Sequence, residues 1–268
     1  MRPAQRGFAL LIVLWTLVLV TLLVTGLVSA GRGETQLAFN LRQAAQLEAA
    51  ADGAVNQAIF HLLDRGPARW VAGGAAHKLA LDAGAASVRI IDEGGRVNPS
   101  NATPALLQAL LRGVGVDAAA AKDLAAAIVE WRTPYGQQDL RLARFDRYRA
   151  AGRSFGPSGA PFLSLDEVAA VFGMTPELMR RLAPHLTLFT DTDPDPAAAD
   201  PIVRAALVSA AGGVLPRSTG SDQLRVLRIV ASVVGTASGA FNRSAVVRLS
   251  MGTDADDVRI LAWTAPAS

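Results

Sequence analysis

The sequence of 268 residues contains no cysteine, which excludes disulfide bonds and leaves its redox compartment unreadable from cysteine usage. It has only three histidines, His61, His77 and His185, and none has a cysteine or glutamate partner at metal-ligand spacing. The hydroxyl groups of Ser154, Ser158 and Ser164 lie outside any Gly-x-Ser-x-Gly motif. We therefore expect no zinc site and no enzymatic activity; a secreted enzyme is the least favoured class.

A strong charge of one sign is also missing. The chain has 26 basic and 23 acidic residues, giving a formal charge of +3, and no basic stripe is evident in the sequence. We therefore expect no nucleic-acid partner. Hydrophobic residues make up 51% of the chain, enough for one membrane helix and one or two modest cores.

The most informative segment that is present is an uncharged run over residues 8–30. Its 23 residues, at about 1.5 Å per residue in a helix, cover the roughly 30 Å hydrocarbon core of a bilayer. Arg2 and Arg6 precede it, so the positive-inside bias places the N-terminus in the cytoplasm and the rest of the chain across the membrane.

Helical periodicity continues beyond this run, and no proline interrupts it before Gly66 and Pro67. The pattern predicts one helix from about residue 8 to about residue 64, with its first half in lipid and its second half on a soluble domain. Its apolar seam is expected to serve the core or a partner, and the sequence does not divide these roles. The seam residues are Leu37, Leu41, Val55 and Ile59.

The rest of the chain predicts an α+β fold. Alternating or Val-rich runs predict antiparallel strands at 87–92, 224–234, 245–250 and 258–263. Between them, residues 98–188 turn to helical periodicity, with Thr103-Pro104, Ser164 and Thr175-Pro176 as helix-start signals. We expect an all-helical domain inserted in a small sheet.

Several segments resemble a known family. Arg6-Gly7-Phe8 before a long apolar helix resembles a type IV pilin-like signal, and Gly7, lacking a Cβ atom, allows a peptidase close approach. Most such pilins carry Glu where this chain has Ile12. Four phrases, in order, resemble the K-type minor pseudopilin of the type II secretion system: GRVNPSNATPALLQALL, AAAIVEWRTPYG, PFLSLDEVAAVFGMTPELMRRLAPHLTLF and VRILAW.

This resemblance implies a pilin-like fold with a defined division of the chain. A prepilin leader at 1–7 would be cut by a prepilin peptidase between Gly7 and Phe8, with methylation of Phe8. The transmembrane part of the long helix would be 8–30 and its periplasmic part 31–66. The sheet region would comprise 67–97 and 189–268, around the helical insert 98–188.

The resemblance also implies a function. The protein would be a single-pass inner-membrane subunit with a periplasmic C-terminal domain. It would form the tip of the pseudopilus with other minor pseudopilins and initiate polymerisation of the major pseudopilin for protein export. Ile12 fits a subunit with no neighbour above it, because an unpaired carboxylate in a bilayer is costly.

Two acidic clusters raise the question of a bound metal ion. Asp191, Asp193 and Asp195 stand at alternating positions near Asp200, and carboxylates so placed can converge on Ca²⁺. A second acidic group contains Asp254, Asp256 and Asp257. A solvated acidic loop is the simpler interpretation, and we expect no other cofactor.

Three alternatives stay open. Val28-Ser29-Ala30 resembles the cleavage site of an ordinary secretory signal, and residues 8–30 alone are compatible with a plain membrane anchor. The segment 111–115 followed by an Ala-rich helix faintly resembles a helix-hairpin-helix, which would suggest a membrane-anchored DNA-uptake component. Asp117 beside that hairpin opposes phosphate binding.

Overall fold

The computed structural model describes the backbone of residues 4–73, 75–135, 138–218, 224–236, 239–251 and 256–265. Within these ranges, the side chains of residues 4–7, 9, 26–35, 138–143, 251 and 256 lie outside the described set.

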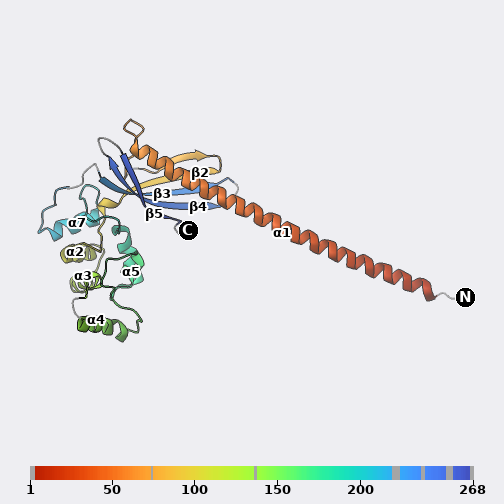
Figure 1. Cartoon of the computed structure of the whole chain (residues 1–268), viewed down its shortest axis with the longest axis horizontal. Helices are drawn as coiled ribbons and strands as arrows, with labels where there is room; N and C mark the ends of the chain where they lie inside the picture. Colours follow the sequence, from red (N-terminus) through yellow and green to blue (C-terminus); the bar gives the residue numbers. More distant parts are fainter. Residues whose placement is uncertain are drawn as a thin grey trace.

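Helix α1 (Ala4–Leu63) is one continuous element of 60 residues, as the periodicity predicts. At about 1.5 Å per residue it is about 90 Å long, and Figure 1 shows most of it extending away from the rest of the molecule. It ends just before Gly66 and Pro67, where Asp64 Oδ1 accepts a hydrogen bond from the Gly66 N–H at 2.8 Å.

Among the described residues, no helix combines the length and the apolar character needed to span a membrane. Within the predicted span 8–30, the structure describes Ala9 and residues 26–30 by their backbone alone, and the same holds for Gly7 before the span.

The sheet has five antiparallel strands in the order β1-β2-β3-β4-β5. Four strands match predicted ones with longer bounds, whereas β1 was not predicted; its short run pairs with β2 as an edge strand. The bounds are β1 (His77–Leu81), β2 (Gly84–Asp92), β3 (Leu224–Gly235), β4 (Ala240–Met251) and β5 (Asp256–Thr264).

One hydrophobic core lies between α1 and the sheet. On α1, buried residues recur every three or four positions, and three of them are alanines, whose small side chains let the helix approach the strands closely. The strands contribute alternate residues, as expected for a sheet with one face covered. The core includes Leu47, Ala51, Ala54, Val55, Ala58, Leu62, Val88, Ile90, Leu227, Ile229, Val247 and Leu249.

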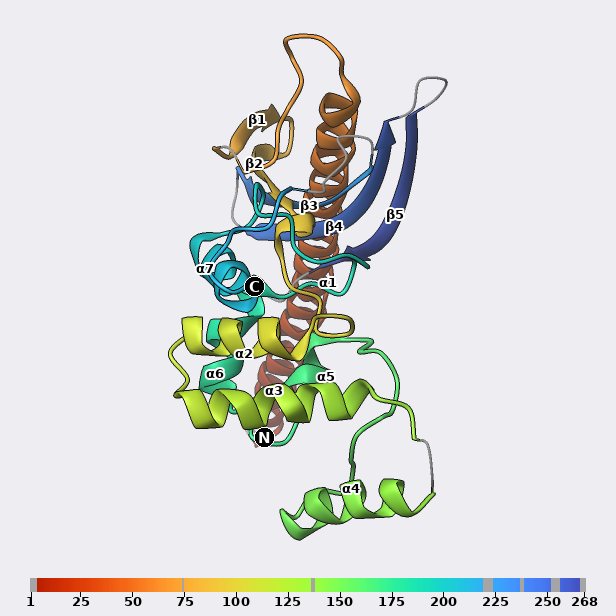
Figure 2. The same ribbon diagram turned by 90° about the vertical axis from the view of Figure 1, so that its left-hand side faces the viewer.

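A second core holds together a helical body, which lies below the sheet in Figure 2. Its helices begin at side-chain caps that the sequence signals in part: Thr103 Oγ1 accepts from the Leu106 N–H, and Ser164 and Thr175 act in the same way. The bounds are α2 (Pro104–Gly113), α3 (Ala118–Arg132), α4 (Gln138–Ala150), α5 (Leu165–Ala169), α6 (Pro176–Leu182) and α7 (Pro201–Ala210).

The predicted end of the helical insert at residue 188 is wrong. Helix α7 packs against α2, and its residues Val203, Ala206 and Leu207 are buried in the core of the helical body. The helical body therefore extends to Ala210. The Asp200 side chain caps α7 by accepting hydrogen bonds from the Ile202 and Val203 N–H groups. In the sequence, Asp200 belongs to an acidic, Pro-rich segment that is typical of a loop, so it is not identified there as a helix start.

Candidate interaction surface

The four predicted seam residues of α1 divide into two groups. Val55 is fully buried and Ile59 is partly buried against the core shared with the sheet. Leu37 and Leu41, in contrast, are 59% and 62% exposed. Assigning Val55 to a partner contact would therefore be wrong, because the sheet of the same chain covers it. Leu37 and Leu41 lie before Leu47, the first buried core residue of α1, and so remain available to a partner.

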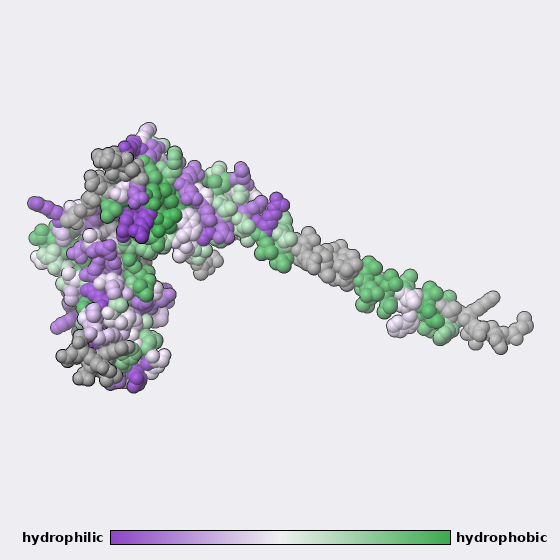
Figure 3. Space-filling view, in the orientation of Figure 1, coloured by the Kyte–Doolittle hydropathy of each residue, from purple (hydrophilic) through white to green (hydrophobic). Residues whose placement is uncertain are grey.

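Exposed apolar side chains continue toward the N-terminus of α1. Phe39 is 53% exposed and Phe8 is 69% exposed. Figure 3 shows hydrophobic residues gathered on the outer half of α1, away from the sheet. A free apolar helix surface of this kind marks a site of contact with protein or membrane. Its other members include Leu10, Leu11, Val13, Leu14, Trp15, Leu17, Leu19, Leu22 and Leu23.

An ion-pair network fixes the rotation of α1 on the sheet. The Arg243 guanidinium on β4 donates hydrogen bonds to Glu48 at 2.7 Å and to Asp52 at 2.5 Å. Its side chain is 8% exposed. Burial alone lowers the pKa of Arg243, but the hydrogen bonds to Glu48 and Asp52 outweigh that effect and the net pKa is raised. The guanidinium thus stays charged beneath the helix.

Charged residues also cluster at the end of β2, where the chain leaves the sheet for the helical body. Glu93 is fully buried, and its Oε1 atom lies 2.7 Å from Arg228 Nε and 3.1 Å from an Arg96 guanidinium nitrogen. Burial is the largest influence on Arg96 and lowers its pKa. Beside this junction, Arg225 binds Asp92 at 2.6 Å. These contacts connect β3 to the end of β2, where the chain leaves for the helices.

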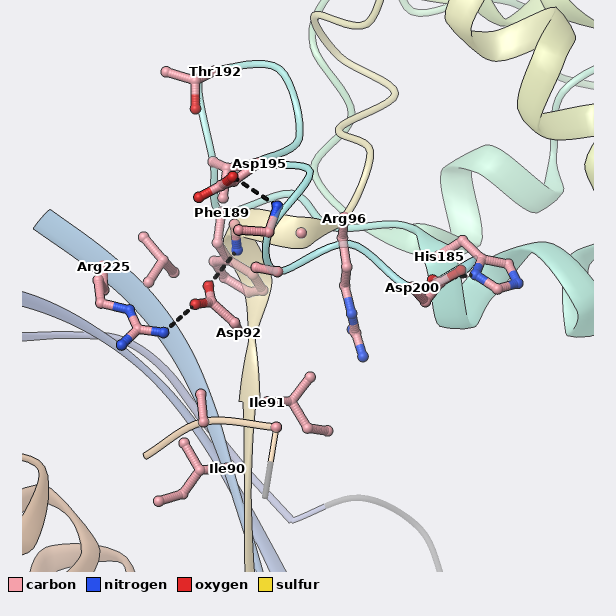
Figure 4. A pocket seen from close by; sticks show the side chains of 18 of the residues that line it. Ile90, Ile91, Asp92, Arg96, His185, Phe189, Thr192, Asp195, Asp200 and Arg225 are labelled. Carbon is pink, nitrogen blue, oxygen red and sulfur yellow. Dashed lines mark hydrogen bonds and ion pairs between the residues drawn. The ribbon is translucent and has the colours of Figure 1, made fainter. Parts of the chain in front are cut away.

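A cavity of about 1420 Å³ opens at this junction. Figure 4 shows Arg225 and Asp92 on one side of it and the paired His185 and Asp200 on the other, with Arg96 between them. The cavity is lined by charges of both signs. We assign no chemistry to it.

The predicted calcium ligands line the same cavity but do not converge. Asp191 and Asp193 are exposed, and Asp195 accepts a hydrogen bond from the Ala197 N–H at 2.9 Å. Across the described residues, no group of three or more acidic or histidine side chains is placed to hold a metal ion. Asp254 and the side chain of Asp256 lie outside the described residues. Calcium binding stays a prediction.

The turn between α2 and α3 is the segment that would bind a DNA phosphate in a helix-hairpin-helix. Its amide groups are used within the turn: the Gly115 N–H donates to the Arg112 carbonyl and the Val116 N–H to the Leu111 carbonyl, both at 3.0 Å. The Asp117 side chain caps α3. These groups are therefore not presented to a phosphate.

Sequence reasoning missed the Arg243 network. The acids Glu48 and Asp52 are four residues apart on one side of the helix, which is the signal that was available, but Arg243 lies far along the chain. The pairing depends on the register of β4, which the sequence alone does not give.

The chain has relatives among known proteins. The family model for type II secretion system protein K matches residues 38–191. A chain of the solved GspK-GspI-GspJ complex from the type 2 secretion system of enterotoxigenic Escherichia coli has the same fold. The TM-score is 0.65 at 16% identity, covering 88% of this chain and 100% of that one. No curated protein gives a match. Since the family model covers more than half of its residues, the chain belongs to the protein K family of the type II secretion system, the K-type minor pseudopilins.

Proposed function

We propose that this minor pseudopilin forms the tip of the type II secretion pseudopilus and initiates its assembly. The observation that carries the proposal is the exposed apolar surface of α1 at Leu37, Phe39 and Leu41, just beyond the sheet of its own chain. Companion minor pseudopilins would cover it with their own long helices. The solved relative was crystallised as a complex of three such proteins, which supports this choice of partner.

The N-terminal segment would position the subunit before assembly. Residues 8–30 hold it in the inner membrane with the N-terminus in the cytoplasm, where a prepilin peptidase cuts after Gly7 and Phe8 is methylated. The remainder lies in the periplasm. Ile12 in place of an acidic residue suits a subunit that needs no partner above it.

The helical body would terminate the fibre. It is a bulky addition to the sheet, and Figure 1 places it at the opposite end of the molecule from the N-terminus. A further subunit stacked beyond the sheet would collide with it. Growth therefore proceeds only below this subunit, where the major pseudopilin adds. The role is structural, with no catalytic step.

Two measurements test this function. The full chain is expressed in a host that carries its prepilin peptidase and companion minor pseudopilins, extracted from membranes and purified. Mass spectrometry is expected to find methylated Phe8 as the first residue, and the companions are expected to co-purify. A start at Gly31 would indicate an ordinary secretory signal, and an uncut Met1 a plain anchor. Absence of all companions would contradict the assembly role.

A further inference from the structure

Beside α1, the sheet has a strip that the described residues cover only in part: the Arg243 guanidinium lies 5.8 Å from the centre of the Trp263 ring, and Ile260 is left exposed. The five strands, spaced about 4.8 Å apart, span about 19 Å from β1 to β5, whereas a helix with its side chains is about 10 Å wide. α1 packs on β2, β3 and β4. On the β1 side, Trp70 and Ala72 of the chain's own loop complete the cover. Figure 2 shows β5 curving away beyond α1 on the other side.

The strip is apolar. Ile260 pairs with Val247, and Trp263 pairs with Ala245, so both β5 residues lie on the face of the sheet that α1 covers elsewhere. Ile260 is nevertheless 52% exposed, and Trp263 is only partly buried. We name this surface, Val258, Ile260 and Trp263, the β5 strip.

The flank of α1 that faces the β5 strip can be identified from its contacts. Glu48 and Asp52 bind Arg243 on β4, next to β5. Leu41 lies seven residues before Glu48, and Ile59 lies seven residues after Asp52. Because seven residues make nearly two full turns at 3.6 residues per turn, all four lie within about 20° of one line along the helix. Leu41 and Ile59 therefore face the same side. The β5 strip and this flank of α1 therefore lie on one side of the molecule, where Glu48 and Asp52 stand between the apolar residues Leu41 and Ile59.

The charge of this surface also restricts which partner helix can bind it. Two carboxylates, Glu48 and Asp52, share the single guanidinium of Arg243, which leaves one negative charge in excess in the middle of the surface. The Glu48 side chain is 53% exposed, so a neighbour can reach it. A partner helix that binds there displaces water from Glu48. Without a basic residue on that helix, the carboxylate would be buried without a partner, which costs free energy.

We propose that the long N-terminal helix of a companion minor pseudopilin lies against α1 over the β5 strip and places a lysine or arginine opposite Glu48. This rests on the proposed function and adds to it the docking face and the chemistry of the partner helix. The partner helix presents an apolar stripe toward Leu41, Ile59 and Ile260, with the basic residue set within it.

Site-specific crosslinking tests the docking face. A photoreactive amino acid replaces Ile260 in the full chain, co-expressed with its companions in membranes, and the products are mapped by mass spectrometry. The matched control is Phe60, which is 69% exposed but lies one residue and about 100° around α1 from Ile59. We expect Ile260 to crosslink to the N-terminal helix of one companion and Phe60 to crosslink to none.

The charge is tested by Glu48→Gln and Glu48→Lys, with Glu177→Lys on the helical body as control, where the side chain is 67% exposed. Co-purification of the companion is expected to fall a few-fold with Gln and at least tenfold with Lys, and to stay unchanged in the control. Because Glu48→Lys can disturb Arg243, the melting temperature of each variant is compared, and Glu48→Gln, which keeps an acceptor, carries the conclusion.

The outcomes separate the two proposals. Companions that co-purify while Ile260 captures nothing, or captures a second copy of this chain, would overturn the docking face and leave the tip function standing. Equal crosslinking from Phe60 would do the same. Loss of all companions from the unmodified chain would overturn both.

Discussion

At the residue scale, the buried Glu93 is the side chain whose loss should matter most. It holds Arg96 and Arg228, whose side chains are 19% and 25% exposed. Glu93→Ala would leave two half-buried cations without their carboxylate, and we expect it to lower the free energy of unfolding by about 3 kcal/mol. Urea denaturation of the purified protein measures this.

The exposed pair of Arg180 and Glu177 supplies the comparison for that variant. Both side chains are more than 60% exposed, at 72% and 67%, so Glu177→Ala should cost at most about 0.5 kcal/mol. Equal effects of the two substitutions would mean that the junction does not depend on Glu93.

Asp200 should make stability depend on pH. Burial alone raises its pKa, but the hydrogen bonds from His185 and from the Val203 and Ile202 N–H groups outweigh it and hold the pKa below its ordinary value. The stabilisation is therefore complete above the unfolded pKa of about 3.9 and is lost as the pH falls through the lower folded value. Asp200→Asn keeps the helix cap without the charge, so its melting temperature should fall less steeply than that of the unmodified protein below pH 4. Parallel slopes would refute this.

At the element scale, α1 carries two kinds of apolar residue that one pair of substitutions separates. Val55→Ala removes buried methyl groups and should lower the free energy of unfolding by about 1–3 kcal/mol. Leu41→Arg, at an exposed position, should leave stability within about 0.5 kcal/mol and abolish co-purification of companions. The seam interpretation fails if Leu41→Arg affects neither property.

The elements differ in how far their sequences predict them. The long period of α1 and the caps Thr103, Ser164 and Thr175 are local signals, and they correctly mark helices. β1 and the end of the helical body depend on contacts between segments rather than on local sequence signals. Leu79 and Leu81 form a strand because β2 lies beside them. Helix α7 belongs to the helical body because it packs against α2. Likewise, no local pattern tells that Val55 is covered by its own sheet while Leu41 is free.

At the scale of the whole molecule, calcium binding is the prediction that a simple measurement settles. If Asp191, Asp193 and Asp195 bind Ca²⁺ in the folded state only, removing it with a chelator lowers the melting temperature, and adding Ca²⁺ restores it. Magnesium at the same concentration is the control. No shift after chelation would remove calcium from the description of this protein.

The sheet order of the whole molecule has a design consequence. Since the five strands follow one another in sequence, and Asp92 pairs with Leu227, the entire helical body occupies the place of a single hairpin loop between β2 and β3. Replacing residues 94–225 with a two-residue Asn-Gly turn would convert the sheet into a plain meander of unchanged strand order. Such a miniature should still fold on α1 and bind companions, yet permit subunits to add above it. Electron microscopy would then show fibres in which subunits have added both above and below the shortened protein. That result would mean that the helical body is what stops addition above it.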